Sequence, residues 1–245
     1  MFQFFADNDC HADEAGPLRL SPALLRHVRA ARIGPREPFT IVLAGGKTLR
    51  VQLEGAPKGS VRVLGEIELS AESPLALSLF LGLSKPDVLE SAVAGATELG
   101  VASIVLVACT RSPPARSAPS RNERLLRILR HAAEVAGRAK LPRLEGPLSF
   151  EDAAGALACF SGPRFVLWEE SARSAPPLQK LLRDLPPAGA AALFTGPEGG
   201  ITPAEVGELK AAGCQVASLG PRILKAHTAP LAAIALAQAA WGDLK

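Results

Sequence analysis

Short apolar runs alternate with longer periodic runs from Leu75 to the end of the chain. The short runs are typical of buried parallel strands, and runs with apolar residues every three or four positions are typical of amphipathic helices. Repeated strand–helix–strand units predict an α/β fold with a mainly parallel sheet covered by helices. The predicted strands are 75–83, 101–108, 164–168, 190–194 and 214–218, and the predicted helices are 84–99, 120–138, 202–212 and 228–241.

Helix start and stop signals support these bounds. Three helices are predicted to begin at a capping box, in which a Ser or Thr and an acidic residue three positions later satisfy free backbone N–H groups. Gly100 and Gly213 are typical of positions just past a helix end. The predicted boxes are Ser84 with Asp87, Ser120 with Glu123, and Thr202 with Glu205.

The first 70 residues have a different pattern, which predicts a small β-rich domain. Ser21 and Pro22 are a favourable cap and first-turn pair for a short helix ending near Ile33. Residues 39–43 and 48–53 are strand-like, with a hairpin signal between them, and 61–69 is a further strand. We place the boundary near residues 71–74, so the predicted domains are 1–72 and 73–245.

Composition narrows the class of protein. No apolar stretch reaches the ~18 residues that a membrane span needs. The acidic start of the chain argues against a secretory signal. The four cysteines are scattered without a Cys-x-x-Cys pair, which predicts buried or free thiols in a reducing cytoplasm and no metal site. The residues concerned are Asp7, Asp9, Asp13 and Glu14, and Cys10, Cys109, Cys159 and Cys214.

Charge is informative by its distribution. The net charge of +3 does not diagnose nucleic-acid binding, but residues 110–145 hold nine Arg or Lys against three acids. This excess could attract RNA phosphates, or it could be a solvated helix face. The chain has no Tyr and only 4% aromatic residues, which argues against a stacking platform for single strands. The candidate phosphate contacts on this helix are Arg121, Arg124, Arg127 and Arg130.

Two glycine-rich stretches carry the candidate chemistry. Residues 194–202 read Phe-Thr-Gly-Pro-Glu-Gly-Gly-Ile-Thr, and residues 219–229 read Leu-Gly-Pro-Arg-Ile-Leu-Lys-Ala-His-Thr-Ala. Each stretch follows an apolar run and precedes a helical run, so each is predicted in a strand-to-helix loop, where open α/β sheets bind ligands. Glycines there let backbone N–H groups approach a ligand. Two such loops in consecutive units predict one shared pocket.

These loops resemble those of the RsmE family, in the SPOUT class of methyltransferases. Members carry a Gly-Pro-Glu-Gly-Gly loop followed by Leu-Gly-x-Arg-Ile-Leu-Arg-x-Glu-Thr-Ala. Arg111-Ser112 and the segment from Ala132 to Pro142 also sit where that family has similar residues. The chain departs from the pattern at three positions: an Arg is usual at Lys225, a Glu at His227 and a Gln at Val135.

The resemblance implies a fold and a reaction. The fold would be a SPOUT-type knotted parallel-sheet domain behind a small PUA-like RNA-binding domain. The segment from about Gly213 would thread through the loop at 196–200, and S-adenosylmethionine would lie bent in this knot. The family methylates N3 of a uridine in 16S ribosomal RNA. SPOUT-like enzymes generally build the site where two subunits meet, so the resemblance implies a homodimer. The expected substrate is therefore 16S ribosomal RNA or the assembled small ribosomal subunit.

Site residues follow from the resemblance. The cofactor-binding residues would be Thr195, Gly196, Pro197, Glu198, Gly199, Gly200, Leu219, Gly220, Ile223, Leu224 and Ala229. Methylation at N3 removes a proton and leaves charge on the flanking carbonyl oxygens, so a nearby cation would help. Arg111, Arg138 and Lys225 are the candidates, although the two arginines could instead contact phosphates or carboxylates. His227 is either a general base or a helix-start residue, Glu198 a charge partner or loop organiser. In the first domain, Arg26, Arg29 and Arg32 are the candidate RNA contacts.

Two other interpretations stay open at this point. The departures at Lys225 and His227 are compatible with an RNA-binding or ribosome-assembly protein that kept the fold without the reaction. A nucleotide-binding α/β domain of unrelated activity would bind ATP or NAD instead. Titration with S-adenosylmethionine separates these interpretations from the methyltransferase.

Overall fold

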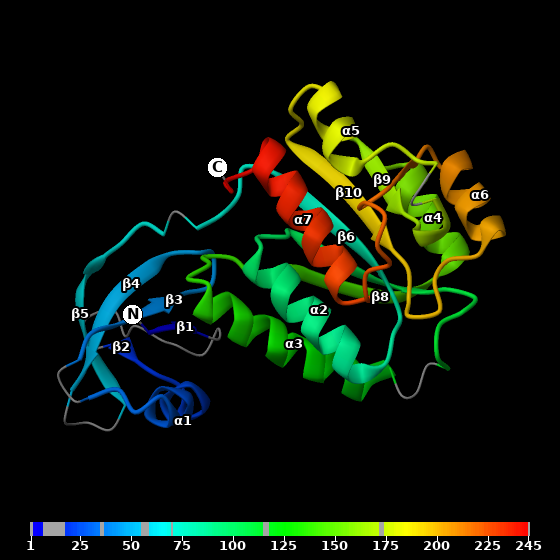
Figure 1. The fold of residues 1–245 in the computed structure, drawn as a ribbon. Helices are drawn as coiled ribbons and strands as arrows, with labels where there is room; N and C mark the ends of the chain where they lie inside the picture. The colour runs from blue at the N-terminus through cyan, green and yellow to red at the C-terminus, as the bar shows by residue number, and fades with distance from the viewer. Residues whose placement is uncertain are drawn as a thin grey trace. The chain divides into compact units, whose positions relative to one another are not determined.

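The computed structural model describes residues 2–6, 18–34, 37–54, 59–69, 71–114, 118–171 and 174–244 (Figure 1). The acidic residues near the start of the chain, Cys10 and Arg116 lie outside these ranges. The chain divides into two compact units. The first consists of 1–72 and 133–140, and the second of 73–132 and 141–245.

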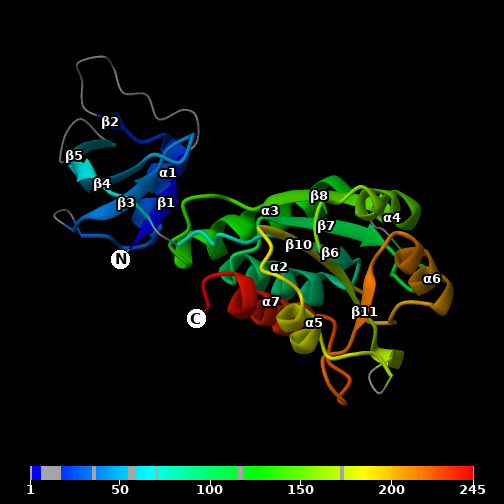
Figure 2. The same ribbon diagram turned by 90° about the horizontal axis from the view of Figure 1, so that it is seen from above.

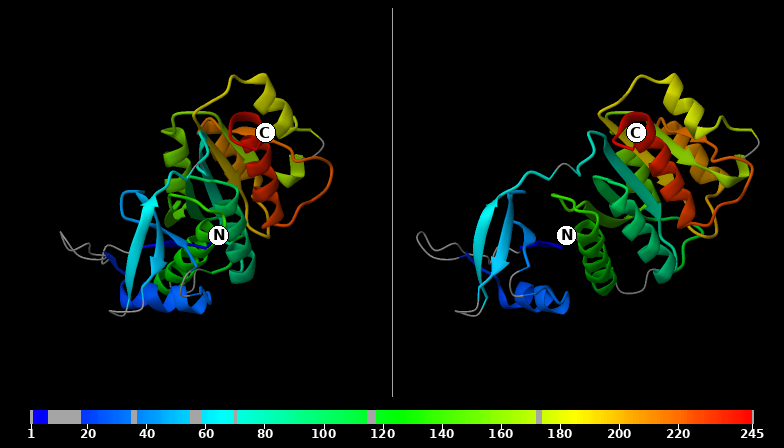
Figure 3. Two further views of the ribbon diagram at one scale, coloured as in Figure 1. Left: turned by 90° about the vertical axis from the view of Figure 1, so that its left-hand side faces the viewer. Right: turned by 60° about the vertical axis from the view of Figure 1, so that its left-hand side comes forward.

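The first unit is built on a five-stranded mixed sheet with the strand order β1-β3-β4-β5-β2. Figure 3 shows this sheet in blue and cyan. Strand β1 is parallel to β3, whereas the other neighbours are antiparallel. The hairpin and the β-rich character predicted for this part of the chain are confirmed. The strands are β1 (Gln3–Phe5), β2 (Leu18–Arg19), β3 (Phe39–Val42), β4 (Thr48–Leu53) and β5 (Ser60–Glu66).

One short helix, α1 (Pro22–Ala30), covers the sheet of the first unit. Its start is as predicted, because the Ser21 hydroxyl accepts a hydrogen bond from the Leu24 N–H at 3.1 Å. Val28 of the helix and Phe39 and Ile41 of the sheet are fully buried in one apolar cluster. This cluster is the core of the first unit.

Residues 133–140 count with the first unit, although the predicted domain 1–72 leaves them out. Ala133 packs in one cluster with Phe5 and Val42, and the Glu134 carboxylate accepts a hydrogen bond from the Phe5 N–H at 3.1 Å. The periodic pattern predicts one helix up to residue 138, whereas the helix α3 (Ala118–Val135) ends earlier and Gly137 has φ +70°. A periodic pattern shows which face of a helix is apolar. It does not show that the end of the helix packs against a different set of residues from its start.

The second unit is built on a six-stranded sheet with the order β11-β9-β10-β6-β7-β8, in which every pair is parallel. The predicted parallel sheet is therefore confirmed. Strand β8 was not predicted, because its sequence Arg-Leu-Glu-Gly-Pro-Leu-Ser resembles a loop; as an edge strand it can accommodate proline. The strands are β6 (Ala76–Gly82), β7 (Ser103–Ala108), β8 (Arg143–Ser149), β9 (Arg164–Leu167), β10 (Ala190–Thr195) and β11 (Gln215–Ala217).

Helices cover both faces of this sheet. Alternate residues of a strand face opposite layers: Leu79 of β6 packs in the cluster of α2, α3, α5 and α7, whereas Phe80 packs with α4 and α6. Figure 2 shows α2, α5 and α7 together on one side. No helix in the described ranges is long and apolar enough to span a bilayer. The helices are α2 (Pro86–Glu98), α3 (Ala118–Val135), α4 (Phe150–Ala158), α5 (Leu178–Asp184), α6 (Pro203–Ala211), α7 (Thr228–Trp241) and the 3-10 turn η1 (Glu169–Ser171).

Two of the three predicted capping boxes are wrong. Helix α2 has Lys85 as its N-cap, and the Ser84 hydroxyl instead donates to the Gly82 carbonyl oxygen. Pro86 explains the shift, since its ring favours the first helical position. Helix α3 begins at Ala118, which places Ser120 inside the helix. The Thr202 box is confirmed, with both reciprocal hydrogen bonds present.

Three cysteines lie in the described ranges, and all three are free thiols. Cys109 and Cys214 are buried, whereas Cys159 is exposed. Burial raises the pKa of Cys109 to about 12, helped by the Glu205 charge. It raises the pKa of Cys214 to about 11, although the Arg164 charge opposes the shift. The buried thiols therefore stay protonated at neutral pH and are unreactive.

Candidate functional site

A cavity of about 650 Å³ opens at the carboxyl ends of three neighbouring strands. Leu167 of β9 pairs in register with Thr195 of β10 and with Ala217 of β11, so the three strands end at the same level. The loops that follow β10 and β11 are the two glycine-rich stretches, and both line the cavity. This is where parallel α/β sheets bind their ligands. The single shared pocket predicted from the two loops is therefore present.

All the residues predicted to hold a cofactor meet in this cavity. They line it from both loops and from the first turn of α7, and the predicted catalytic Lys225 lines it as well. The residues are Thr195, Gly196, Pro197, Glu198, Gly199, Gly200, Leu219, Gly220, Ile223, Leu224 and Ala229.

Two glycines of the first loop are required for different reasons. Gly200 has φ +75°, and a Cβ there would overlap the Glu169 carboxylate. Gly199 does not have a positive φ, but a Cβ there would approach Arg111 Cβ at 2.9 Å. Both glycines allow side chains of neighbouring loops to pack directly on the loop backbone.

Arg111 contacts the outside of the glycine loop. Its Nη1 donates to the Gly199 carbonyl oxygen at 3.1 Å and lies 3.9 Å from Glu170 Oε1. Arg111 is not among the residues that line the cavity. The guanidinium therefore braces the loop that forms the pocket, and its predicted catalytic role stays a prediction.

The segment that carries Arg111 is held by Glu205 of α6. The Glu205 carboxylate accepts hydrogen bonds from the Thr110 N–H at 2.7 Å and from the Thr202 N–H at 2.8 Å. Burial opposes ionisation of this carboxyl, but these hydrogen bonds and one from the Thr202 hydroxyl outweigh it and lower its pKa. The capping box thus ties two loops together as well as starting a helix.

Glu198 joins the glycine loop to the start of α2. Its Oε2 accepts a hydrogen bond from the Lys85 backbone N–H at 3.0 Å, and its Oε1 lies 3.6 Å from Lys85 Nζ. Glu198 is therefore both a loop organiser and a charge partner at a helix N-terminus. That helix is α2, although α6 is the helix that follows Glu198 in the sequence.

Sequence reasoning missed two parts of the cavity wall. Trp168 and Glu169 follow β9, and their position after a parallel strand is a signal that could have found them. The Trp168 indole N–H also donates to the Ile201 carbonyl oxygen at 3.2 Å. The other missed wall is one face of α2, with Asp87 and Ser91. No local signal marks that face, because it depends on how α2 packs.

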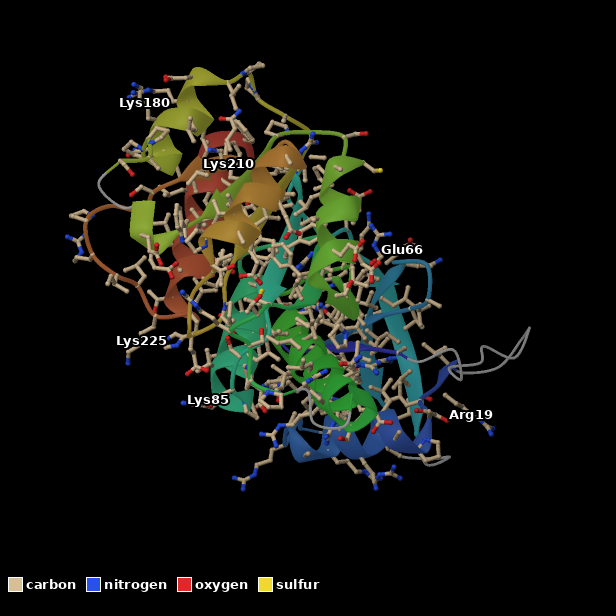
Figure 4. All side chains as sticks on the ribbon, turned by 90° about the vertical axis from the view of Figure 1, so that its right-hand side faces the viewer. Arg19, Glu66, Lys85, Lys180, Lys210 and Lys225 are labelled. Atoms are coloured by element: carbon tan, nitrogen blue, oxygen red, sulfur yellow. The ribbon has the colours of Figure 1, made fainter. Side chains whose placement is uncertain are left out.

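Lys225 and His227 both line the cavity from the loop before α7. Figure 4 shows the Lys225 side chain pointing away from the ribbon, and the residue is exposed. His227 is the N-cap residue of α7, but its side chain makes no capping hydrogen bond. Both residues therefore form part of the cavity wall.

Arg138, one of the candidate catalytic residues, is buried in an ion pair and does not line the cavity. It belongs to the first unit, and its side chain is 4% exposed. Its Nη2 lies 2.9 Å from Glu72 Oε2, and its backbone carbonyl accepts a hydrogen bond from Gln3 at 2.6 Å. Arg138 does not line the cavity, so the structure gives it a structural contact while its catalytic role stays a prediction.

The predicted RNA-binding arginines fall into two groups. Arg26, Arg29 and Arg32 are exposed on and just after α1 in the first unit, and the other four lie on α3 in the second unit. Arg124 and Arg127 are exposed, whereas Arg121 and Arg130 are partly buried. Arg124 is engaged by Glu90, with its Nε 2.6 Å from Oε1.

The cavity combines apolar and charged walls. Leu219 and Leu224 are apolar, Asp87 and Glu169 are acidic, and Arg222 and Lys225 are basic. Thr195 is 2% exposed, and its hydroxyl oxygen has no hydrogen-bond partner. A buried polar atom without a partner is uncommon in native proteins. The arrangement suits a small molecule with an apolar body, a positive charge and hydrogen-bonding groups.

Comparison with known proteins assigns the family. The RNA methyltransferase domain profile matches residues 71–238. Ribosomal RNA small subunit methyltransferase E from Synechocystis is 33% identical over 88% of this chain and 71% of its own length. The protein of that name from Bacillus subtilis is 29% identical over 91% of this chain and 90% of its own length.

A solved structure shares the whole fold. The crystal structure of a ribosomal RNA small subunit methyltransferase E from Neisseria gonorrhoeae bound to S-adenosyl methionine has a TM-score of 0.86 and 29% identity. The match covers 100% of both chains, which confirms the predicted fold class, while the threading of the knot stays a prediction. With a family profile over most of its length and relatives of one name, this chain belongs to the RNA methyltransferases of the ribosomal RNA small subunit methyltransferase E family.

Proposed function

We propose that the chain transfers a methyl group from S-adenosylmethionine to N3 of a uridine in 16S ribosomal RNA. The observation that carries this proposal is the cavity formed by both glycine-rich loops at the ends of β9, β10 and β11. The names of the relatives and the S-adenosyl methionine bound to the Neisseria gonorrhoeae protein support it.

The cavity residues fit this cofactor. The unpartnered Thr195 hydroxyl offers a hydrogen bond to a polar edge. Leu219 and Leu224 offer apolar surface for an adenine ring, and Ile223, which is 83% exposed, would be covered in part by the cofactor and in part by a second copy of the chain. Asp87 and Glu169 provide negative charge for a sulfonium and an ammonium group. A Cβ at Gly200 would disturb this wall by displacing Glu169.

Residues at the pocket mouth would act on the RNA base. When bound, S-adenosylmethionine supplies a methyl group whose bond to sulfur breaks as the bond to N3 forms. Lys225 would stabilise the negative charge on the uracil carbonyl oxygens as N3 loses its proton. The His227 imidazole lines the same pocket and would accept that proton. Arg111 would keep the loop in place through its hydrogen bond to Gly199.

The remaining roles are assigned to the two units. The first unit would hold RNA through the exposed Arg26, Arg29 and Arg32, and the second unit would hold the cofactor and the target base. The protein would act as a homodimer in the cytoplasm, on 16S ribosomal RNA or the assembled small subunit.

The test has two stages. Isothermal titration is expected to show one S-adenosylmethionine site per chain. The purified protein is then incubated with naked 16S ribosomal RNA, or with small subunits, from a strain lacking the gene. Mass mapping of nuclease fragments is expected to find one new 3-methyluridine. Cofactor binding without a new methyl group on either substrate would favour the non-catalytic RNA-binding alternative, and absence of cofactor binding would refute the proposal.

A further inference from the structure

A second cavity, of about 680 Å³, lies in the second unit between the start of α2 and the first half of α3. It is lined by Pro86, Leu89 and Glu90 of α2, whereas Asp87 and Ser91 of the same helix line the first cavity. The two cavities therefore lie on opposite sides of one helix, which is about 10 Å wide with its side chains.

Arg121 is the unexplained group of this second cavity. Its Nε and Nη2 atoms are buried and have no hydrogen-bond partner among the residues that the structure describes. A buried cationic donor without a partner costs free energy, so native proteins normally pair it. The neighbouring Arg124 shows the usual arrangement, since its Nε and Nη2 contact both carboxylate oxygens of Glu90 at 2.6 and 2.9 Å. Within the described part of the chain, Arg121 therefore lacks an anionic partner.

The rest of the lining indicates what that partner is. Among the described residues that line the cavity, four are basic and one is acidic, and the acid is the Glu90 already paired with Arg124. A guanidinium fork binds a phosphate through two parallel hydrogen bonds. The exposed rings of Pro86, Pro113 and Pro114 offer apolar surface, over three buried leucines, against which a nucleobase or ribose can pack. The apolar residues are Leu83, Pro86, Leu89, Pro113, Pro114 and Leu125.

We propose that the second cavity binds a nucleotide of the RNA strand that flanks the target uridine, with its phosphodiester on Arg121. This inference rests on the proposed function. The target base would enter the first cavity, and the strand would pass the start of α2 to place a neighbouring nucleotide in the second. Lys85 lies at that crossing, with its side chain 71% exposed beside the strand path, and Arg127 adds positive charge at the rim.

The test uses the full chain with Arg121→Leu, and Arg183→Leu as a matched control. Arg183 is an exposed arginine of α5 that lines neither cavity. Affinity is measured by fluorescence anisotropy with a labelled single-stranded RNA decamer that has one central uridine, without cofactor. Arg121→Leu is expected to weaken RNA binding about tenfold, the loss of one charged hydrogen-bonded contact, while Arg183→Leu leaves it unchanged.

Stability separates a ligand-binding arginine from a structural one. Because the buried Nε and Nη2 atoms of this partly buried residue have no partner among the described residues, Arg121→Leu is expected to raise the melting temperature. Cytidine 5′-monophosphate is expected to raise the melting temperature of the wild type but not of Arg121→Leu, and cytidine without phosphate should shift neither. A lower melting temperature for Arg121→Leu, or equal RNA affinity in both proteins, would overturn the inference.

These outcomes are distinct from failure of the proposed function. If the chain forms 3-methyluridine and Arg121→Leu binds the decamer like the wild type, only the second site is refuted. If no methyl transfer occurs but Arg121→Leu still weakens RNA binding and gains stability, the second site stands as an RNA site of a chain without the reaction.

Discussion

Gly200 shows how one residue shapes the pocket. It follows a loop whose backbone is contacted by Arg111 at Gly199 and by the Glu169 carboxylate at Gly200 itself. A left-handed φ and a close side-chain contact coincide at this position, so only the absence of a Cβ satisfies both. A glycine at position 200 is thus required for Glu169 to form part of the pocket wall.

We expect Gly200→Ala to lower S-adenosylmethionine affinity at least tenfold and the free energy of unfolding by about 1–2 kcal/mol. The methyl group forces Glu169 away from the pocket wall and strains the backbone. Isothermal titration and urea unfolding measure the two effects. Gly207→Ala in α6 is the control: a Cβ there meets nothing within 4 Å, so stability should rise by about 0.5–1 kcal/mol. Unchanged cofactor affinity in Gly200→Ala would mean that the loop is only a turn.

The ion pair with Glu72 gives Arg138 a structural role. We expect Arg138→Met to lower the free energy of unfolding by about 1–3 kcal/mol, because Glu72 would lose its ion pair while its side chain is 24% exposed. Cofactor affinity should be unchanged. Urea unfolding and titration are the measurements. If stability stays normal and the methylation rate at saturating RNA falls instead, the catalytic assignment made from sequence is right.

At the scale of elements, helix α6 anchors two loops through one carboxylate. Glu205 caps its own helix through Thr202 and also binds the Thr110 N–H, directly before Arg111. The end of β7 is thereby fixed relative to the glycine loop, which lies between β10 and α6. A capping box is a local motif, but here its carboxylate also holds the segment after β7 against the start of α6.

This arrangement predicts a dependence of stability on pH. The pKa of Glu205 is lowered on folding, so its stabilisation is fully present above the unfolded value near 4.5 and is lost as pH falls through the lower folded value. Glu205→Gln keeps the size of the side chain but cannot ionise. The difference in unfolding free energy between wild type and variant should be largest at neutral pH and shrink below about pH 4.5. Urea unfolding at pH 7 and about pH 3.5 checks this; a difference independent of pH would contradict it.

At the scale of the whole molecule, the final helix leaves less apolar surface for a partner than its sequence suggests. The sequence of this helix offers Leu231, Ile234, Leu236 and Trp241 for a dimer contact. Ile234 and Trp241 are buried within the second unit, and the Trp241 indole N–H donates to the Leu182 carbonyl oxygen. Leu231 and Leu236 are only partly buried. A partner would therefore contact these two leucines and the exposed Ile223.

We expect a homodimer, with twice the 25.5 kDa mass of one chain, in light scattering at micromolar concentration. Apolar residues that remain exposed beside a functional pocket favour self-association. Ile223→Asp should reduce the dimer fraction, while Lys180→Asp on the exposed side of α5 serves as a charge-change control. A wild-type mass of one chain at this concentration would refute the prediction.

Local sequence patterns alone predicted a large part of the fold and of the candidate site. The parallel strands, the Thr202 capping box, the helix Thr228–Trp241 and the single pocket under two glycine loops all follow from patterns within a few residues of one another. Such patterns are readable because apolar periodicity and glycine placement act on the nearest turns of the chain. Strand β8 was not predicted, because its glycine and proline give it the local sequence pattern of a loop.

Only the tertiary structure decided which side chains meet. Glu198 binds Lys85 across 113 positions of sequence, and Arg111 binds Gly199 across 88. The wall contributed by α2, the pairing of Arg138 with Glu72, and the unpartnered nitrogens of Arg121 likewise depend on how separate elements pack. Periodicity specifies which face of an element is apolar, but not which distant residue faces its charged groups. The partners of the charged residues, and with them the roles of the arginines, are therefore set by the fold.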